Sequence, residues 1–236
     1  MASISRLLFI TGTFLASPVA AQELKPLCPD RGAFQPCTVD PGHIQVEIGL
    51  LDWFQDADDT RLIADAVVRL GLDDTSEVQL AMSPMVRKSF AQGRGDLRLS
   101  YRKRLVEGDF SLAVQPSIQL PTGSSKLSAG RLIPGIAFGS TYDITPRTQF
   151  YLTPYAVKGQ YLLGGTFLGV NQILHGPISG TVEYMIQHQR GETQSSADFT
   201  LAYTASKSVE FDINANIGLT RQTPAVEFVL GVTKEF

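Results

Sequence analysis

The sequence has no apolar run long enough to cross a bilayer as a helix. A membrane-spanning helix needs about 20 consecutive apolar residues, and after residue 21 polar or turn-forming residues break every apolar stretch before that length. The chain has no basic patch either, because 20 Lys and Arg are spread among 23 Asp and Glu, for a net charge of −3. A helical membrane protein is therefore excluded, and a nucleic-acid partner has no support.

Cysteine is scarce, with only Cys28 and Cys37 in the chain. They flank a short loop that contains proline and glycine, and in an exported chain such an isolated pair predicts a disulfide. A zinc site needs about four ligands, and no histidine lies nearer to the pair than His43. No other residues have metal-ligand spacing, so we expect neither a metal nor another cofactor.

Histidine is equally scarce, which limits the catalytic chemistry available. A barrel enzyme of the lipase or protease kind needs a histidine beside a serine or a pair of acids. The histidines are His43, His175 and His188, in separate parts of the chain, and no serine sits in a recognisable nucleophile setting. We therefore predict no catalytic residues and no enzyme activity.

The first 21 residues have the pattern of a cleavable secretory signal. Arg6 supplies an early positive charge, an apolar run follows over residues 7–16, and small residues end the segment at Ala21. The run is too short to span a bilayer, as expected for a signal that is removed. We predict cleavage after Ala21 and export from the cytoplasm.

The rest of the chain is organised by alternation. From residue 43 onward, twelve segments place an apolar side chain at every second position and a polar or small one between. The last segment, residues 224–236, sets Val226, Phe228 and Leu230 against Glu227. Such strands have one apolar and one polar face, which fits either a soluble β-sandwich or a membrane barrel with lipid outside and water inside.

Connection lengths favour the barrel. Short turns follow every second strand, and longer or more polar links follow the others, as in outer-membrane barrels with short periplasmic turns and longer outer loops. The longer links are expected at residues 85–95, 122–131, 158–165 and 189–198. Aromatic residues of the apolar register fall beside the short turns or the C-terminus, which predicts a belt at one membrane interface: Tyr101, Phe110, Tyr142, Phe150, Tyr203, Phe211 and Phe236.

Together these patterns predict an all-β protein, a transmembrane antiparallel up-and-down β-barrel of about 12 strands. We assign residues 1–21 to a signal peptide, residues 22–42 to a periplasmic segment that holds the Cys28–Cys37 disulfide, and residues 43–236 to the barrel. The expected location is the outer membrane of a Gram-negative bacterium. The soluble sandwich is the alternative fold.

The polar register predicts a charged lumen. A basic wall opposite an acidic wall would set a transverse field across a narrow pore; alternatively, the charges bridge one another and hold the barrel together, and both readings stay open. The expected lumen-lining residues are the basic Arg61, Arg69, Arg98, Arg102 and Arg104 and the acidic Glu47, Glu183, Glu210, Asp212 and Glu227.

Residues 95–124 resemble a known family. They open on Gly-Asp at 95–96, continue with an alternating strand that leads to the basic Lys103, and end the next strand on Pro-Thr-Gly at 121–123. This pattern resembles the outer-membrane transporter-like family named for the MetA pathway of phenol degradation. The resemblance implies an outer-membrane channel for small, often aromatic or hydrophobic compounds, and it carries over no functional residue. Lys103 departs from expectation by lying in the apolar register.

The C-terminus resembles the signal by which outer-membrane barrels are recognised for assembly. Gly231 and Phe236 stand in the expected places, and Lys234 stands where an apolar residue is more usual. The expected partners are outer-membrane lipid, the barrel assembly machinery and small-molecule solutes. We expect a channel for small solutes; the alternatives are a structural or lumen-blocked barrel without transport and a lipid-modifying barrel enzyme.

Overall fold

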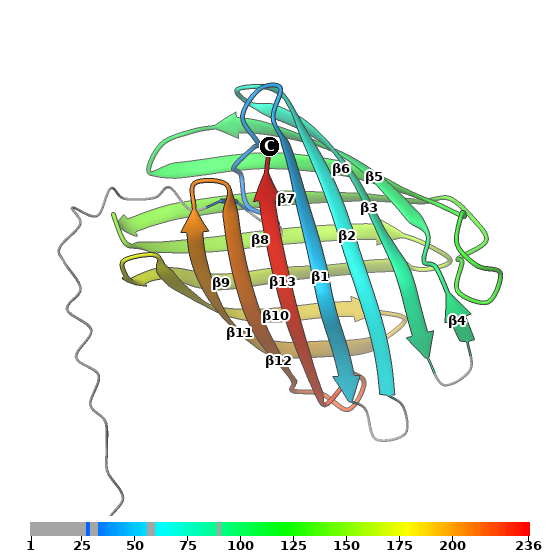
Figure 1. Ribbon diagram of the computed structural model, residues 1–236. Coiled ribbons are helices and arrows are strands. Elements are labelled where there is room, and N and C mark those ends of the chain that lie inside the picture. The colour runs from blue at the N-terminus through cyan, green and yellow to red at the C-terminus, as the bar shows by residue number, and fades with distance from the viewer. Residues whose placement is uncertain (1–26, 29–32, 56–59, 89–90) are drawn as a thin grey trace, which may run out of the picture.

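The computed structural model describes residues 27–28, 33–55, 60–88 and 91–236 of the chain. These residues form one antiparallel β-sheet that closes on itself as a barrel (Figure 1). The predicted signal peptide, residues 1–21, lies outside the described part. Within that part no helix is long and apolar enough to cross a membrane.

Among the described residues, twelve long strands make the barrel wall, and a short strand, β4 (Ala91–Gly93), pairs with the end of β3. The wall strands are β1 (Ile44–Gln55), β2 (Thr60–Asp73), β3 (Ser76–Lys88), β5 (Leu97–Val106), β6 (Phe110–Leu120), β7 (Ile133–Thr145), β8 (Thr148–Lys158), β9 (Leu162–His175), β10 (Ile178–Gln189), β11 (Glu192–Ser206), β12 (Val209–Gly218) and β13 (Val226–Glu235).

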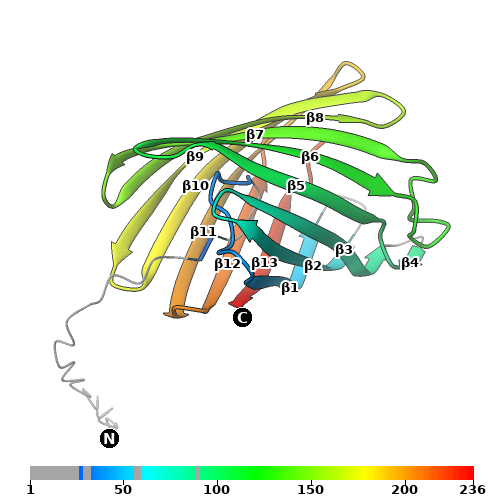
Figure 2. The same cartoon turned by 90° about the horizontal axis from the view of Figure 1, so that it is seen from above.

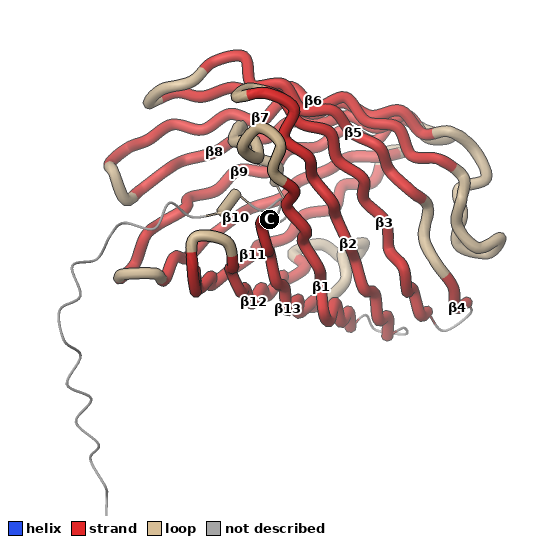
Figure 3. Tube along the Cα trace, turned by 45° about the horizontal axis from the view of Figure 1, so that its top comes forward, coloured by secondary structure: helices blue, strands red, loops and turns tan. Residues whose placement is uncertain are grey.

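The barrel closes because the first and last strands pair. β1 lies between β13 and β2, with Glu47 opposite Thr233 on one side and Val67 on the other. The β2–β3 pairing completes the ring, and each remaining wall strand pairs with the next one along the chain. Figure 3 shows these strands running round the barrel at a tilt. The predicted antiparallel barrel of about 12 strands is confirmed.

The polarity of the wall is the reverse of that in a soluble protein. Large apolar side chains on its outward face are exposed, among them Leu99, Leu201 and Ile213, whereas Arg69 and Arg102 are the largest fully buried side chains. A soluble sandwich would bury its apolar face between two sheets. An apolar outside around a polar inside is instead the pattern of a barrel built for contact with lipid.

Aromatic residues lie opposite one another on the outward face, beside the short turns. Tyr142 on β7 pairs with Phe110 on β6 and with Phe150 on β8, and Tyr203 on β11 pairs with Phe211 on β12. All five rings are exposed. The pairing gathers them into a belt at the short-turn end of the barrel, where amphipathic rings suit a membrane interface.

The last two of the four predicted long loops are wrong. Only residues 159–161 separate β8 from β9, and β10 turns into β11 through Arg190 and Gly191, with φ angles of 55° and 85°. Two successive residues with positive φ make the tight hairpin turn that matches strand twist. Residues 192–198 are polar and resemble a loop, yet in β11 Ser196 is fully buried. Residues 192–198 carry no large apolar side chain in either register, so alternation does not reveal this part of the strand.

The two ends of the 95–124 pattern meet in space. Asp96 accepts hydrogen bonds from the backbone N–H groups of Gly123 (2.8 Å) and Ala129 (2.9 Å) and from the side chain of Gln119 (3.0 Å). Burial acts to raise the pKa of Asp96, but the hydrogen bonds outweigh it and hold this pKa at about 2. The pattern thus clamps the loop between β6 and β7 to the start of β5.

Candidate functional site

A segment that precedes β1 lies inside the barrel. Leu27, Phe34 and Val39 are buried, and the view in Figure 2 shows this part of the chain within the ring of strands. We call Leu27, Cys28 and residues 33–42 the plug segment. Its contacts with both sides of the wall, described below, place it across the lumen.

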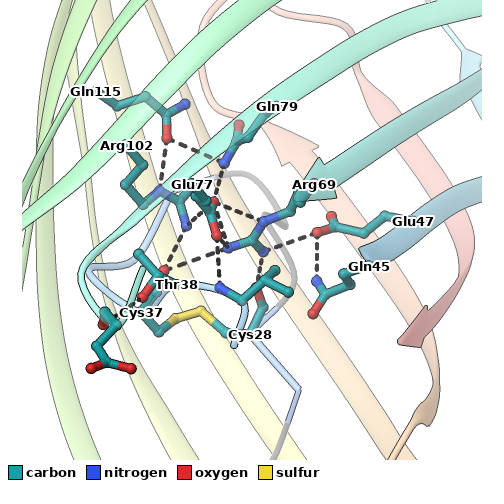
Figure 4. Close-up of polar contacts among 12 residues, drawn as sticks. Cys28, Cys37, Thr38, Gln45, Glu47, Arg69, Glu77, Gln79, Arg102 and Gln115 are labelled. Carbon is teal, nitrogen blue, oxygen red and sulfur yellow. Dashed lines mark hydrogen bonds and ion pairs between the residues drawn. A yellow bond between two sulfur atoms is a disulfide. The ribbon is translucent and has the colours of Figure 1, made fainter. Parts of the chain in front are cut away.

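The predicted disulfide is confirmed, since Cys28 and Cys37 are joined. Their backbone carbonyl oxygens accept hydrogen bonds from two arginines of the wall (Figure 4). Arg102 on β5 donates from Nη1 to Cys37 at 2.9 Å. Arg69 on β2 donates to Cys28 and, at 3.5 Å, to Cys37. Both arginine side chains are fully buried. Their hydrogen bonds to the cysteine carbonyl oxygens therefore hold the disulfide loop against the wall.

Glu77 on β3 lies between these two arginines. Its carboxylate accepts a two-point contact from Arg69, through Nε at 2.9 Å and Nη2 at 3.0 Å, and lies 3.4 Å from Nη1 of Arg102. The same carboxylate accepts the backbone N–H of Val39 at 2.8 Å. Two-point arginine contacts are among the strongest polar interactions in proteins. One buried carboxylate therefore holds both arginines and the plug segment.

Glu47 on β1 supplies a second negative charge beside the two arginines. It lies 3.1 Å from Nη1 of Arg69, so two carboxylates stand beside two guanidinium groups on neighbouring strands. We call Glu47, Arg69, Glu77 and Arg102 the charged wall. Buried charges are tolerated when each has such partners and further hydrogen bonds. Three glutamine side chains make those bonds: Gln45 donates to Glu47 (2.8 Å), Gln79 donates to Glu77 (2.6 Å), and Gln115 accepts from Nε of Arg102 (2.8 Å).

The plug segment reaches the other side of the lumen through fewer contacts. Thr153 on β8 donates from its hydroxyl to the carbonyl oxygen of Phe34 at 3.0 Å, and Glu183 on β10 accepts the backbone N–H of Ala33. Gly139 on β7 lies so close to Phe34 that a Cβ there would be 2.8 Å from its carbonyl oxygen. We call Gly139, Thr153 and Glu183 the opposite wall.

Phe34 connects the two walls. Its backbone touches the opposite wall, and its ring lies under the guanidinium group of Arg102, 4.8 Å from ring centroid to Cζ. A desolvated cation over an aromatic face is an attractive contact. The plug segment therefore spans the lumen from β5 to β8.

The plug segment leaves the lumen along β2. Pro41 pairs with Gly71, and the N–H of Gly42 donates to the carbonyl oxygen of Gly71 at 2.9 Å. A Cβ at Gly71 would overlap the carbonyl oxygens of Val39 and Asp40. Glycine is required here because the two backbones approach too closely for any side chain.

A polar cavity of about 570 Å³ lies on the short-turn side of the plug segment. Leu27 and the disulfide form part of its lining. Amide, hydroxyl and charged side chains from several strands line much of the remainder, among them Arg104, Gln149, Asn171 and Glu210, together with Pro146 and Ile173. This cavity, which we call the polar cavity, offers hydrogen bonds to water or to a polar solute.

The lumen on the long-loop side of the plug segment contains apolar side chains. Tyr155 on β8 stacks on Phe167 on β9, with ring centroids 5.3 Å apart, and Phe167 lies opposite Met185 on β10. The hydroxyl of Tyr155 donates to Gln187 at 2.7 Å, which places this ring in the same register as the inward polar residues. We call Tyr155, Phe167 and Met185 the aromatic cluster.

The five predicted lumen-lining arginines lie at different heights. Arg69 and Arg102 belong to the charged wall, and Arg104 lines the polar cavity. Arg98 is exposed near the other end of β5. The side chain of Arg61 lies outside the described part of the structure. The ion pairs of the charged wall join neighbouring strands and do not cross the lumen.

The predicted acids differ in their contacts. Glu47 is part of the charged wall, whereas Glu183 on the far side accepts the hydroxyl of Tyr151 at 2.8 Å. Glu210 accepts the hydroxyl of Thr204 at 2.9 Å and borders the polar cavity. The strands that carry the predicted acids, β10, β12, β13 and β1, lie in one continuous part of the ring.

Asp212 and Glu227 lie on the strands near the closing seam. Glu227 on β13 lies opposite Asn216 on β12. A Cβ at Gly231 would overlap the carboxylate of Asp212, so this glycine has a packing role beside its predicted place in the assembly signal. The N–H of Phe236 donates to the carbonyl oxygen of Ile44 at 2.9 Å, so the pairing between the first and last strands extends to the last residue.

Sequence reasoning missed the importance of Glu77, Thr153, Tyr155 and Phe167. Glu77 stood out only as an acid among arginines, yet its position directly opposite Arg102 follows from strand register. Tyr155 and Phe167 fall in expected strands, but the register that brings their rings together was not known from the sequence. Register between neighbouring strands is the signal that would have found all four.

Comparison with known proteins shows which structures share this fold. No family model matches the sequence, and no curated protein matches it. The structure is similar to the COG4313 outer membrane channel from Pseudomonas putida F1, with 13% sequence identity, a TM-score of 0.63, and coverage of 89% of this chain and 100% of that one. The fold is that of an outer-membrane channel barrel.

Two porins show the same likeness. One is the KdgM porin in complex with disordered oligogalacturonate, with 10% identity, a TM-score of 0.59, and coverage of 82% of this chain and 99% of that one. The other is the NanC porin, with 9% identity, a TM-score of 0.59, and coverage of 82% and 98%. At these identities the likeness describes the fold.

Proposed function

We propose that this protein is an outer-membrane channel for small solutes, and that the plug segment is the barrier that a solute must displace. The observation that carries this proposal is the order of features along the lumen. The aromatic cluster lies on the long-loop side, the plug segment crosses the middle, and the polar cavity lies on the short-turn side. A small solute with an aromatic or apolar part would contact the cluster first and then enter a hydrated compartment.

The charged wall supports a displaceable plug. Its two carboxylates and two guanidinium groups balance one another without any group from the plug segment. Removing the plug segment therefore leaves no net buried charge on the wall, which avoids the large cost of an unpaired buried ion. The barrel can remain folded with the lumen open.

The chemistry of the aromatic cluster supports solutes of the kind implied by the family resemblance. Aromatic rings attract other rings in stacked or edge-on geometry, by about 0.5–1.5 kcal/mol beyond area burial. We also propose that the chain belongs to the MetA-pathway transporter-like family. Two features support this: the aromatic cluster, and the hydrogen bonds by which Asp96 joins the two ends of the 95–124 pattern.

Planar-bilayer recording and solute uptake by liposomes test the channel function. We expect small single-channel conductance for the full mature chain, a larger one after deletion of residues 22–38, and faster uptake of aromatic than of aliphatic solutes of equal size. Phe167→Ala should reduce this preference, and Phe199→Ala is the matched control because Phe199 is exposed on the outward face.

A lumen-blocked structural barrel is the second candidate, and the buried ion network under the plug segment favours it. It predicts that the full chain is electrically silent and takes up no solute, while the deletion of residues 22–38 conducts. That combination of results would exclude the channel proposal.

We also propose that residues 1–21 direct export, that residues 22–42 enter from the periplasmic side, and that the assembly machinery recognises the C-terminus. The belt of paired rings and the apolar outward face support placement in the outer membrane. Deleting Phe236 should reduce the fraction of barrel inserted in membranes, measured by heat-dependent gel mobility, more than it reduces transport per inserted molecule. Normal insertion of the truncated chain would contradict the proposed assembly signal.

A further inference from the structure

Three metal-binding side chains meet at the short-turn end of the barrel, where the plug segment leaves the lumen. Asp40 is near the end of the plug segment, His43 directly precedes β1, and Glu235 ends β13. Their ligand atoms all lie within 4.8 Å of one another, and Nδ1 of His43 is 2.9 Å from Oε1 of Glu235. Residues separated by 192 positions in sequence thus converge on one point.

The backbone under these side chains is held in place. The N–H of His43 donates to the carbonyl oxygen of Asp40 at 3.0 Å, and the N–H of Glu235 donates to the carbonyl oxygen of Ser208 at 2.9 Å. Gln45 lies opposite Glu235 in the β1–β13 ladder. A site built on paired backbone needs only side-chain rotation to reach a common ion, which keeps the ordering cost low.

The three side chains are reached by solvent, and Asp40 and His43 are exposed. The side chain of His43 is 51% exposed and that of Glu235 is 19% exposed. The nearest lysine along β13, Lys234, lies in the outward register with Nζ 4.5 Å from the ring centroid of Phe236. In a tetrahedral site with metal-to-ligand distances of about 2.0–2.2 Å, two ligand atoms stand about 3.4 Å apart, so rotation of the side chains by an ångström or so closes the set.

We propose that Asp40, His43 and Glu235 bind one first-row transition-metal dication, with Zn²⁺ as the representative ion. One imidazole nitrogen with two carboxylates suits zinc and its neighbours, whereas Mg²⁺ and Ca²⁺ prefer oxygen ligands alone. Water completes the coordination. The bound ion ties the end of the plug segment to the seam between β1 and β13.

This site predicts a stabilising effect that is independent of transport. An ion that binds the folded barrel but not the unfolded chain raises stability by mass action, and here it also restrains the exit of the plug segment. Zinc should therefore raise the midpoint of thermal unfolding of the mature chain. The effect should saturate at one ion per barrel.

The test is calorimetric titration of Zn²⁺ into the chelator-treated mature chain, refolded without a histidine tag. We expect one saturable site, no comparable heat with Mg²⁺, and weakening in His43→Gln of more than about tenfold, because even outer partners of a metal ligand are worth 10–100-fold. Asp40→Asn and Glu235→Gln should weaken binding as well.

Matched controls come from the other two histidines. His175→Gln and His188→Gln should bind Zn²⁺ as the parent does, and heat-dependent gel mobility confirms that each variant is a folded barrel. Absence of saturable binding would overturn the site. So would binding that survives His43→Gln or that is lost in either control variant.

Discussion

The two walls that hold the plug segment differ in how they do it. The charged wall surrounds the disulfide loop with two guanidinium groups and a carboxylate, and these groups hold one another as well as the plug (Figure 4). The opposite wall offers a hydroxyl, a carboxylate and a glycine that allows close approach. One side is a cooperative ionic network, and the other is a small set of separate contacts.

This difference suggests how the lumen opens. In a network each group depends on the others, so breaking a single ionic contact leaves a buried charge without its partner. The separate contacts of the opposite wall can be lost one at a time. We therefore expect the plug segment to leave β7, β8 and β10 first while the disulfide loop stays docked on β2, β3 and β5.

The largest effect should follow Glu77→Gln. The change removes the carboxylate that lies between Arg69 and Arg102, and breaking a buried ionic arrangement costs about 3–5 kcal/mol. We expect that loss of unfolding free energy in urea, together with increased single-channel conductance. Glu107→Gln is the control, because Glu107 is a largely exposed acid 3.3 Å from Arg104 and should matter little. Equal effects of the two changes would show that the buried network of the charged wall contributes no more than an exposed ion pair.

Gly139→Val should come next. The added side chain would collide with Phe34, and overpacking of this kind costs about 1–3 kcal/mol. We expect the plug segment to be pushed from the opposite wall, seen as a higher conductance with the ion network intact. Gly164→Val is the control, because a Cβ at Gly164 meets no atom closer than 4.0 Å. An unchanged conductance in Gly139→Val would show that Phe34 does not restrict the lumen.

Thr153→Val should have a smaller effect. It removes the donor to the carbonyl oxygen of Phe34 while keeping the shape of the side chain, and such a hydrogen bond contributes about 1 kcal/mol. Longer or more frequent open events in single-channel traces are the expected result. The comparison between the walls would fail if this variant opened the channel more than Glu77→Gln does.

The smallest effect on the channel should come from acid, which breaks the hydrogen bonds that Asp96 makes to the loop between β6 and β7. The pKa of Asp96 is lowered to about 2, below the value of about 3.9 for a free aspartate. Its stabilising contribution is therefore full above about pH 4 and is lost as the pH falls towards 2. In the parent, an acid protease should cut residues 122–131 faster as the pH falls from about 4 towards 2. In Asp96→Asn, the faster cleavage should be present at every pH tested. Plug-dependent conductance should follow neither change.

Much of this architecture could be predicted from local pattern. Alternation in segments such as residues 224–236 is set by the chain alone, because successive side chains of a strand point to opposite faces. The disulfide followed from an isolated pair of cysteines in a chain that the sequence predicts to be exported. The prediction failed in residues 192–198, because both registers there are polar or small and the contrast that alternation depends on is missing.

The sequence by itself determined the barrel, its strand number and its two faces, since these depend on period-two patterning and short turns. It did not determine what fills the lumen. Which groups meet there depends on register around a closed ring and on the path of the plug segment. Only the tertiary structure therefore decided that Glu77 joins two arginines to the disulfide loop, and that Asp40, His43 and Glu235 meet at its exit.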